Sequence, residues 1–199
     1  MKSRRDFLKE MGIYAGSASM LAMVPWMKAF AEENGQNIAA SDRVRLAVIG
    51  VGSRGRALLQ NLLEIENVEV VAVCDNYEPN FQKAKEMTGN QAQAFYDYKK
   101  LLDQTKNLDG VVIATPLHEH AHITIDCLNA GLHVLCEKSM ARTLEDSKNM
   151  VDASLETGKI LQIGQQRLFN PIYLNALERI KAGEIGQITQ VRAFWHRNN

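Results

Sequence analysis

Between Arg43 and Gly164 the chain alternates short runs rich in Val and Ile with segments of helical periodicity. The apolar runs that we expect to be strands cover 44–50, 68–75, 93–96, 110–115, 133–136 and 159–164. The segments that we expect to be helices cover 57–65, 79–89, 119–130 and 143–158, with a helical turn near 99–104. Strands that alternate with helices at this spacing form βαβ units, whose right-handed crossovers give a parallel sheet covered on both faces. The pattern therefore predicts an α/β fold with a doubly wound parallel sheet, and we place this domain at 42–165.

Residues 1–31 have the features of an export signal. The stretch SRRDFLK at 3–9 resembles the twin-arginine motif, a mildly apolar segment follows at 11–27, and Ala-Phe-Ala at 29–31 fits a cleavage site. Glycines, serines and a proline interrupt the apolar segment, so we expect no stable membrane span after cleavage. We therefore expect a periplasmic protein, exported in the folded state, with a polar linker at 32–41. The alternative for 1–31 is a basic amphipathic helix of a cytosolic protein.

Charge and cysteine content exclude two classes of protein. The formal net charge is +0, and five of the 23 basic residues fall within the first 31 residues, so the remainder carries no basic surface for nucleic acid. Cys74, Cys127 and Cys136 are odd in number, lack a Cys-x-x-Cys spacing and lie in apolar runs. A disulfide framework or a zinc ribbon is therefore not expected, and the three thiols should be buried and unreactive.

A glycine-rich motif follows the first expected strand and opens the first expected helix. Its six residues are Gly50, Val51, Gly52, Ser53, Arg54 and Gly55, which form a G-x-G-x-x-G. In this context one glycine makes a tight turn, one lets a pyrophosphate approach the backbone, and one lets helix and strand pack closely. The N-terminus of the helix supplies N–H donors and the positive end of its dipole. The motif predicts a dinucleotide-binding Rossmann domain in which Gly50, Gly52, Ser53, Arg54 and Gly55 contact the cofactor.

Asp75 lies 20 residues after Gly55, at the end of the second expected strand. A carboxylate there accepts hydrogen bonds from a ribose diol and repels a 2′-phosphate, so NAD is favoured over NADP as the cofactor.

The stretch ATPLHEHAH at 114–122 allows two interpretations. His118 and His122 match the H-E-x-x-H motif of zinc proteases, which requires both histidines in one helix and a third ligand further on. Pro116 stands two residues before His118, directly after a buried strand, so His118 should precede the helix. We therefore favour a strand-to-helix loop at the carboxyl edge of the sheet, in which Thr115 and Pro116 contact the cofactor, and expect no metal.

Glu137 and Lys138 follow the fifth expected strand and should project at the same carboxyl edge, beside the cofactor crevice. A lysine in that position can donate a hydrogen bond to the oxygen of a carbonyl or alcohol that undergoes hydride transfer. We therefore assign Lys138 and Glu137 as candidate catalytic residues, and Glu137 also as a cofactor contact.

These motifs together resemble those of the glucose–fructose oxidoreductase / inositol dehydrogenase / MocA family, from about Val44 to Asn199. The resemblance rests on the three glycines, on Asp75, on T-P-x-x-x-H at Thr115, Pro116 and His120, on GLHVLCEKS at 131–139, and on GQQRLFNP at 164–171. It implies NAD(P)-dependent hydride transfer at a hydroxyl-bearing carbon of a sugar or cyclitol, with Lys138 positioning the reacting oxygen. It also implies that His120 lies at the cofactor site.

Two departures from the family pattern matter. Ser139 replaces a proline whose preceding bond is often cis, and a cis bond before serine costs about 2.5–4 kcal/mol, so the local backbone is expected to differ. Residues 166–199 should form a crossover helix at 170–183 and a first strand at 188–199 of a second domain that the chain does not complete. In the family that domain supplies further acid/base groups and the homo-oligomer contact. The chain alone is therefore expected to be inactive.

The resemblance leaves other functions open. The main alternative is an NAD-dependent glycosidase, although members with that activity lack the lysine of the Glu-Lys pair. A non-catalytic NAD-binding protein is the second alternative, and a zinc hydrolase is the third.

Overall fold

The computed structural model describes residues 43–194. The predicted export signal, the linker at 32–41 and the last five residues, with Trp195 and His196, lie outside the described residues.

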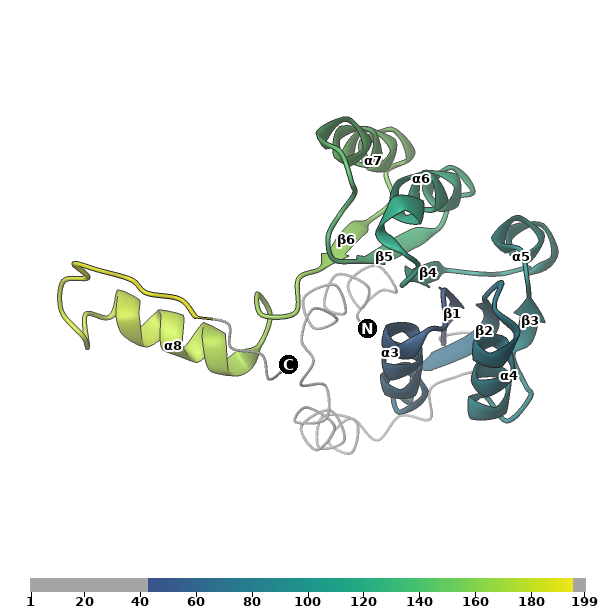
Figure 1. Cartoon of the computed structure of the whole chain (residues 1–199), viewed down its shortest axis with the longest axis horizontal. Coiled ribbons are helices and arrows are strands. Elements are labelled where there is room, and N and C mark those ends of the chain that lie inside the picture. The colour runs from purple at the N-terminus through teal and green to yellow at the C-terminus, as the bar shows by residue number, and fades with distance from the viewer. Residues whose placement is uncertain (1–42, 195–199) are drawn as a thin grey trace.

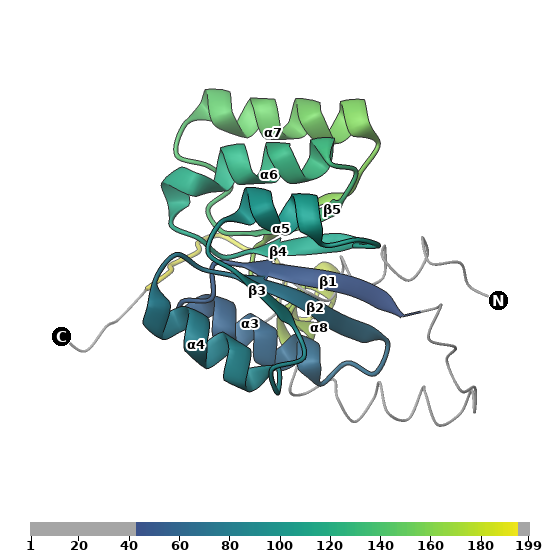
Figure 2. The ribbon, with the colours of Figure 1, turned by 90° about the vertical axis from the view of Figure 1, so that its right-hand side faces the viewer.

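Six strands form one parallel sheet, in the order β3-β2-β1-β4-β5-β6 (Figures 1 and 2). Their bounds are Val44–Ile49 (β1), Val68–Cys74 (β2), Gln93–Phe95 (β3), Gly110–Ile113 (β4), His133–Glu137 (β5) and Leu161–Gly164 (β6). All six lie at the places predicted from the sequence. Ile49 pairs with Cys74 on one side and with Ile113 on the other, so the carboxyl ends of the central strands are level. The strand order reverses between β1 and β4, where ligands of doubly wound sheets bind.

Helices cover both faces of this sheet, and a last helix, α8, lies away from it (Figure 1). The helices are α3 (Ser53–Leu63), α4 (Glu78–Met87), α5 (Tyr98–Gln104), the 3₁₀ helix η2 (Leu117–Glu119), α6 (His120–Asn129), α7 (Leu144–Thr157) and α8 (Pro171–Lys181). Figure 2 shows α3 and α4 on one face and α5, α6 and α7 on the other. The fold is therefore the Rossmann-type α/β arrangement that the alternation predicts.

Two hydrophobic clusters, one on each face, hold the helices to the sheet. Leu58, Leu59 and Leu62 of α3 pack with Val48 and Val73 on one face. Leu101 of α5, Ile123 and Leu128 of α6 and Met150 of α7 pack on the other face. Burial of such apolar surface stabilises the domain by about 25 cal/mol for each Å² removed from water.

The ends of α7 follow local signals in the sequence. The side chain of Thr143 accepts a hydrogen bond from the backbone N–H of Asp146 at 3.0 Å, and this contact caps the start of the helix. Gly158 ends it in the left-handed conformation, with φ at 65°.

The three cysteines are buried in the cluster beneath α5, α6 and α7, and none is in a disulfide. Burial raises the pKa of Cys74 and of Cys127 to about 12, and that of Cys136 to about 11. The prediction of buried thiols is therefore confirmed, and their low reactivity stays a prediction that the raised pKa values support, since the thiolate is the reactive form.

The segment after β6 differs in part from the prediction. The expected helix is present as α8, which extends away from the sheet and buries none of its residues (Figure 1). The strand expected at 188–199 is not formed over 188–194, which have no regular secondary structure, and 195–199 lie outside the described residues. A strand needs a neighbour for its backbone hydrogen bonds, and no strand of the described sheet pairs with this segment. The predicted division into domains at 42–165 and 166–199 stays a prediction.

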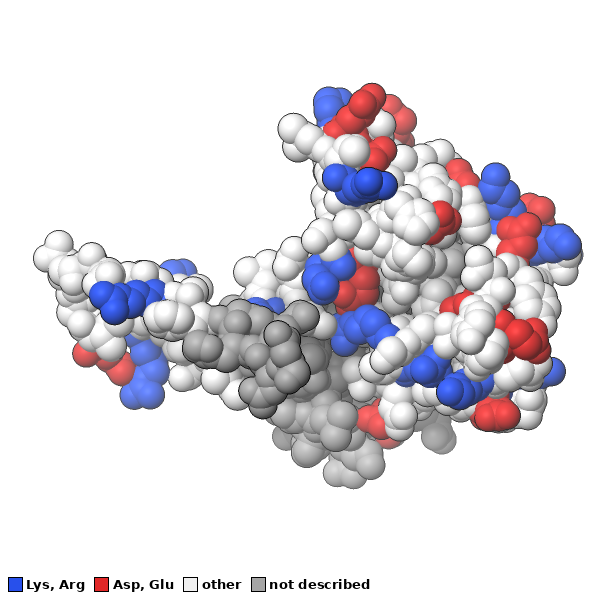
Figure 3. Space-filling view, in the orientation of Figure 1, with Lys and Arg blue, Asp and Glu red and all other residues white. Residues whose placement is uncertain are grey.

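In the described part of the chain, no helix is long and apolar enough to cross a membrane. Basic and acidic side chains are interspersed on the face shown in Figure 3.

Candidate cofactor and active site

Glycine occupies the three motif positions for different structural reasons. Gly50 has φ at +84°, and a Cβ there would lie 2.6 Å from the backbone nitrogen of Thr115. A Cβ at Gly55 would lie 1.9 Å from the carbonyl oxygen of Gly50. Packing alone therefore demands glycine at both positions. Gly52 is different, because a Cβ there would meet only Asn80 Nδ2, at 3.8 Å. The free space above Gly52 is where a ligand can approach the backbone.

The N-terminus of α3 is open to an anion. Gly52 is the capping residue and provides no side-chain hydrogen bond, and the first turn has no acidic residue. The leading N–H groups of a helix lack intrahelical partners, and together with the helix dipole they favour a bound phosphate. Ser53 and Arg54 begin this turn, so the structure places them where the sequence predicted a pyrophosphate contact.

Asp75 follows the end of β2 and is oriented by two backbone groups. Its Oδ2 accepts a hydrogen bond from the N–H of Val51 at 2.8 Å, and its Oδ1 accepts one from the N–H of Tyr77 at 2.9 Å. Each carboxylate oxygen can accept a further hydrogen bond. The carboxylate is thus attached to the glycine loop and can still receive the hydroxyls of a ribose.

A cavity of about 1210 Å³ lies between the carboxyl edge of the sheet and the segment that follows β6. Five of the predicted site residues line it: Arg54, Thr115, His120, Glu137 and Lys138. The others, Gly50, Gly52, Ser53, Gly55, Asp75 and Pro116, are not among its lining residues and belong to the glycine loop, the end of β2 and the turn after β4. The structure therefore brings the β4, β5 and glycine-loop contributions together, as the strand order predicts.

Thr115 and His120 hold the loop after β4. Thr115 lines the cavity, and its Oγ1 is buried and has no hydrogen-bond partner among the described residues. His120 is 2% exposed; its Nδ1 lies 2.8 Å from the carbonyl oxygen of Ser139, and its Nε2 lies 3.0 Å from that of Thr115. Both ring nitrogens of His120 are therefore directed at backbone carbonyls. The geometry makes His120 a positioning residue that also lines the cavity, and its contact with the cofactor stays a prediction.

Glu137 and Lys138 have different surroundings. Glu137 is 6% exposed, and its Oε1 accepts a hydrogen bond from Nε of Arg54 at 2.7 Å and forms an ion pair with Nη2 of Arg54, also at 2.7 Å. Its Oε2 accepts the backbone N–H of Lys138 at 3.1 Å. Lys138 is exposed at the cavity edge, and its Nζ has no hydrogen-bond or ion-pair partner within residues 43–194. Lys138 is therefore available to a substrate, whereas Glu137 is engaged by the protein itself.

The peptide bond between Lys138 and Ser139 is cis. The difference in local backbone that was expected from the replacement of proline by serine is therefore not found.

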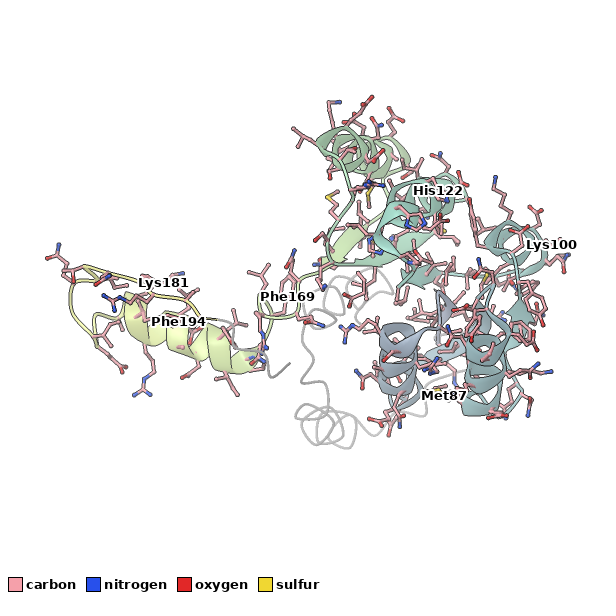
Figure 4. All side chains as sticks on the ribbon, viewed as in Figure 1. Met87, Lys100, His122, Phe169, Lys181 and Phe194 are labelled. Atoms are coloured by element: carbon pink, nitrogen blue, oxygen red, sulfur yellow. The ribbon has the colours of Figure 1, made fainter. Side chains whose placement is uncertain are left out.

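His118 and His122 flank the carboxylate of Glu119. His118 lies in η2, before α6, as the position of Pro116 predicted, and His122 lies in α6 (Figure 4). The Nε2 atoms of both histidines are 3.2 Å from oxygens of Glu119. Within residues 43–194 no group of three or more His, Cys, Asp or Glu side chains is suited to a metal ion.

One wall of the cavity was not predicted as part of the site. It is formed by the connection from β6, where Phe169 lies (Figure 4), and by α8. The wall residues are Gln165, Gln166, Arg167, Leu168, Tyr173, Leu174, Ala176, Leu177 and Ile180. Within α8, the spacing of Tyr173, Leu177 and Ile180 on one helical face could have indicated this wall. The guanidinium of Arg167 lies 5.6 Å from the ring centre of Tyr173, an arrangement typical of a cation–π contact.

The sequence profile of the Gfo/Idh/MocA family, described as an oxidoreductase family with an NAD-binding Rossmann fold, matches residues 44–165. The chain belongs to this family. A glycosyl hydrolase family 109 protein from Stenotrophomonas maltophilia is 30% identical over 98% of the chain and 42% of its own length. An inositol 2-dehydrogenase from Salmonella typhimurium is 33% identical over 72% of the chain and 43% of its own length. The chain thus spans less than half the length of these relatives.

Solved structures of the family agree with the fold. The WlbA dehydrogenase from Bordetella pertussis, in complex with NADH and UDP-GlcNAcA, superposes with a TM-score of 0.66. It is 31% identical, and the match covers 72% of this chain and 43% of that one.

The residues present fit the dinucleotide that the family binds. The space above Gly52, the uncapped start of α3 and the unpartnered hydroxyl of Thr115 lie along the carboxyl edge of β1 and β4. NAD(H) is therefore the cofactor, and the start of α3 and Asp75 would be the groups that hold its pyrophosphate and its adenosine ribose.

Proposed function

We propose that this chain is the nucleotide-binding half of an NAD-dependent oxidoreductase that transfers a hydride to or from a hydroxyl-bearing carbon of a sugar or cyclitol. Bound NAD supplies the hydride chemistry. The observation that carries the proposal is the position of Lys138, which lies exposed on the cavity wall with Thr115 and Arg54. The inositol dehydrogenases among its relatives support a polyhydroxylated substrate.

Lys138 has the chemistry that this reaction needs. Its ammonium can donate a hydrogen bond to the oxygen of the reacting carbon, which polarises a carbonyl or stabilises the oxygen as an alcohol loses its proton. The backbone of Lys138 is held by the Glu137 carboxylate, while its side chain remains accessible. Positioned general acid–base groups of this kind contribute about 10²–10⁴ in rate.

Calorimetric titration of the chain with NAD⁺ and with NADP⁺ tests the cofactor. We expect binding of NAD⁺ in preference to NADP⁺, because Asp75 repels a 2′-phosphate. A folded protein that binds neither nucleotide would contradict the proposal. The full gene product is then incubated with NAD⁺ and a set of cyclitols, hexoses and uronic acids, and NADH absorbance is followed.

An NAD-dependent glycosidase is the second candidate, favoured by the family 109 protein that aligns with 98% of the chain. Such an enzyme oxidises its sugar and reduces it again, so no NADH accumulates. The Glu137–Lys138 pair supports the dehydrogenase. Release of nitrophenol from nitrophenyl glycosides without net NADH would decide for the glycosidase. Binding of NAD⁺ without either activity would indicate a non-catalytic nucleotide-binding protein.

We also propose that the protein acts in carbohydrate metabolism in the periplasm and reaches it through the twin-arginine route. The motif at 3–9 and the Ala-Phe-Ala at 29–31 support this proposal. A reporter fused after residue 41 should be exported, and joint replacement of Arg4 and Arg5 by lysine should retain it in the cytoplasm. We propose further that the full gene product is a homo-oligomer, which light scattering would test.

A further inference from the structure

The guanidinium of Arg54 connects the glycine loop to the strand that carries the candidate catalytic lysine. Arg54 is the second residue of α3, and Glu137 is the last residue of β5, 83 positions later in the chain. Nε and Nη2 of Arg54 both lie 2.7 Å from Glu137 Oε1. Because both groups are charged, this is a charge-assisted hydrogen bond, which is stronger than a bond between neutral groups.

The Glu137 carboxylate is buried and closely packed, and both of its oxygens accept hydrogen bonds from the protein. It is 6% exposed, and it packs so closely on Gly164 of the neighbouring strand that a Cβ added there would lie 3.2 Å from its Oε1. The other oxygen, Oε2, accepts the backbone N–H of Lys138 at 3.1 Å. Arg54 therefore acts on the backbone of Lys138 through a single buried carboxylate.

A second buried side chain, that of His120, contacts the residue that follows Lys138. His120 Nδ1 lies 2.8 Å from the carbonyl oxygen of Ser139, and His120 is 2% exposed. Lys138 thus lies between two restrained backbone groups, its own N–H and the carbonyl of Ser139. Lys138 itself is exposed and lines the cavity.

The position of Arg54 is unfavourable by local criteria. A cation in the first turn of a helix lies at the positive end of the helix dipole, which is unfavourable. The first turn of α3 has no acidic residue to offset it, and the compensating charge comes from Glu137. A residue that opposes local preference and is compensated from a distant strand is typical of a functional position.

We propose that Arg54 is a positioning residue that sets the place of Lys138 through Glu137 and so couples the pyrophosphate site to the lysine. The inference rests on the proposed function. Its consequence is that the nicotinamide end of the cofactor, beside Lys138, depends on Arg54 more than the pyrophosphate end does.

The test compares NAD⁺ with ADP-ribose, which has the same adenosine and pyrophosphate but no nicotinamide. Both are titrated into the 199-residue chain and into its Arg54→Gln, Arg54→Lys and Glu137→Gln variants. We expect Arg54→Gln and Glu137→Gln to weaken NAD⁺ binding about tenfold, because the backbone of Lys138 is no longer held in place, and ADP-ribose binding much less. Arg54→Lys, which retains the charge, should restore part of the loss.

Two further variants sharpen the comparison. Arg54→Gln leaves Glu137 buried without its partner and can unfold the chain, so the double variant Arg54→Gln/Glu137→Gln, which leaves no unpaired charge, is also titrated. The double variant should bind NAD⁺ no more weakly than either single variant, because the two residues act as one unit. Arg56→Gln is the matched control on the same helix: Arg56 bonds Val51 and Asn80, not Glu137, so the ratio of the two affinities should not change. Equal weakening of both ligands by Arg54→Gln would make Arg54 a pyrophosphate ligand and overturn the proposal.

A measurement without nucleotide separates this proposal from the proposed function. The backbone amide resonance of Lys138 reports its hydrogen bond to Glu137, and we expect Arg54→Gln to shift it while Arg56→Gln does not. An unchanged Lys138 amide in Arg54→Gln would overturn the positioning role. Failure of the wild-type chain to bind either ligand would instead overturn the proposed function, and the amide result would still stand.

Discussion

Asp75 Oδ2 accepts a hydrogen bond from the backbone N–H of Val51 at 2.8 Å. The acid at the end of β2 and the glycine loop after β1 are therefore one unit, in which the residue expected to bind the ribose also supports the loop that receives the pyrophosphate. A substitution at this position consequently affects cofactor selectivity and loop order together.

Replacement of Asp75 by asparagine should narrow the preference for NAD⁺ over NADP⁺. The variant removes the charge that repels a 2′-phosphate and weakens the hydrogen bonds to the ribose, so NAD⁺ affinity should fall by about 1.5–3 kcal/mol. Calorimetric titration with both nucleotides checks this expectation. An unchanged ratio of the two affinities would show that Asp75 does not contact the ribose.

Gly52→Ala should mainly weaken NAD⁺ binding, whereas Gly55→Ala should mainly lower the stability of the fold. Gly52 has φ at −60° and space for a Cβ, so alanine there should change the free energy of unfolding by less than about 1 kcal/mol. Its methyl group would obstruct the pyrophosphate, and NAD⁺ binding should fall at least about tenfold. A Cβ at Gly55 would lie 1.9 Å from the Gly50 carbonyl, so that variant should be destabilised by about 1–3 kcal/mol or more.

Thermal unfolding followed by circular dichroism, together with NAD⁺ titration, separates these two variants. If Gly52→Ala binds NAD⁺ as tightly as the wild type, the space above Gly52 is not the pyrophosphate site.

Lys138→Met in the full gene product should lower kcat by about 10²–10⁴ while NAD⁺ affinity changes little. Methionine keeps the apolar part of the side chain and removes the hydrogen-bond donor to the reacting oxygen. Steady-state NADH formation and calorimetric NAD⁺ titration measure the two effects. Retention of near wild-type kcat would exclude Lys138 as the group that polarises the substrate.

Stability should fall in alkaline solution because of the buried thiols. Burial raises the pKa of Cys127 from the ordinary value of 9.0 to about 12, and Cys74 behaves similarly. Above pH 9 the unfolded chain loses thiol protons that the folded chain retains, so the stabilising contribution present below pH 9 declines as the pH rises toward the folded values. Each thiol should cost about 1.4 kcal/mol per pH unit in this interval.

Urea unfolding as a function of pH measures this loss, and Cys127→Ala provides the control. The control variant should show a smaller slope of stability against pH, by the contribution of one thiol. If the wild type and Cys127→Ala had identical slopes, the loss of stability at alkaline pH would have to come from other groups.

The fold was predictable because its signals are local. Val and Ile runs, the spacing of leucines on α3 and the glycines that end helices are visible within a few residues of each other, and crossover rules then leave few topologies. The segment 188–194 shows the limit of such signals: its alternation of apolar and polar residues is a strand pattern, yet a strand forms only when a neighbour accepts its backbone hydrogen bonds.

The site was predictable only in part, because its residues meet through contacts between distant parts of the chain. Lys138, Thr115 and the glycine loop could be placed together because the carboxyl ends of parallel strands meet at one edge. The cavity wall from Gln165 to Ile180 was missed because most of this stretch, from residue 166 on, was assigned to a second domain, and its apolar helical spacing does not show which surface it faces.

The sequence by itself determined the order of strands and helices, the glycine loop, the acid of β2 and the position of the lysine, because periodicity and turn residues act over short distances. Only the tertiary structure decided which side chains meet. It joins Arg54 to Glu137 across 83 residues, and it directs both nitrogens of His120 at backbone carbonyls. Such contacts depend on strand register, helix rotation and rotamer, which packing determines after the local elements have formed.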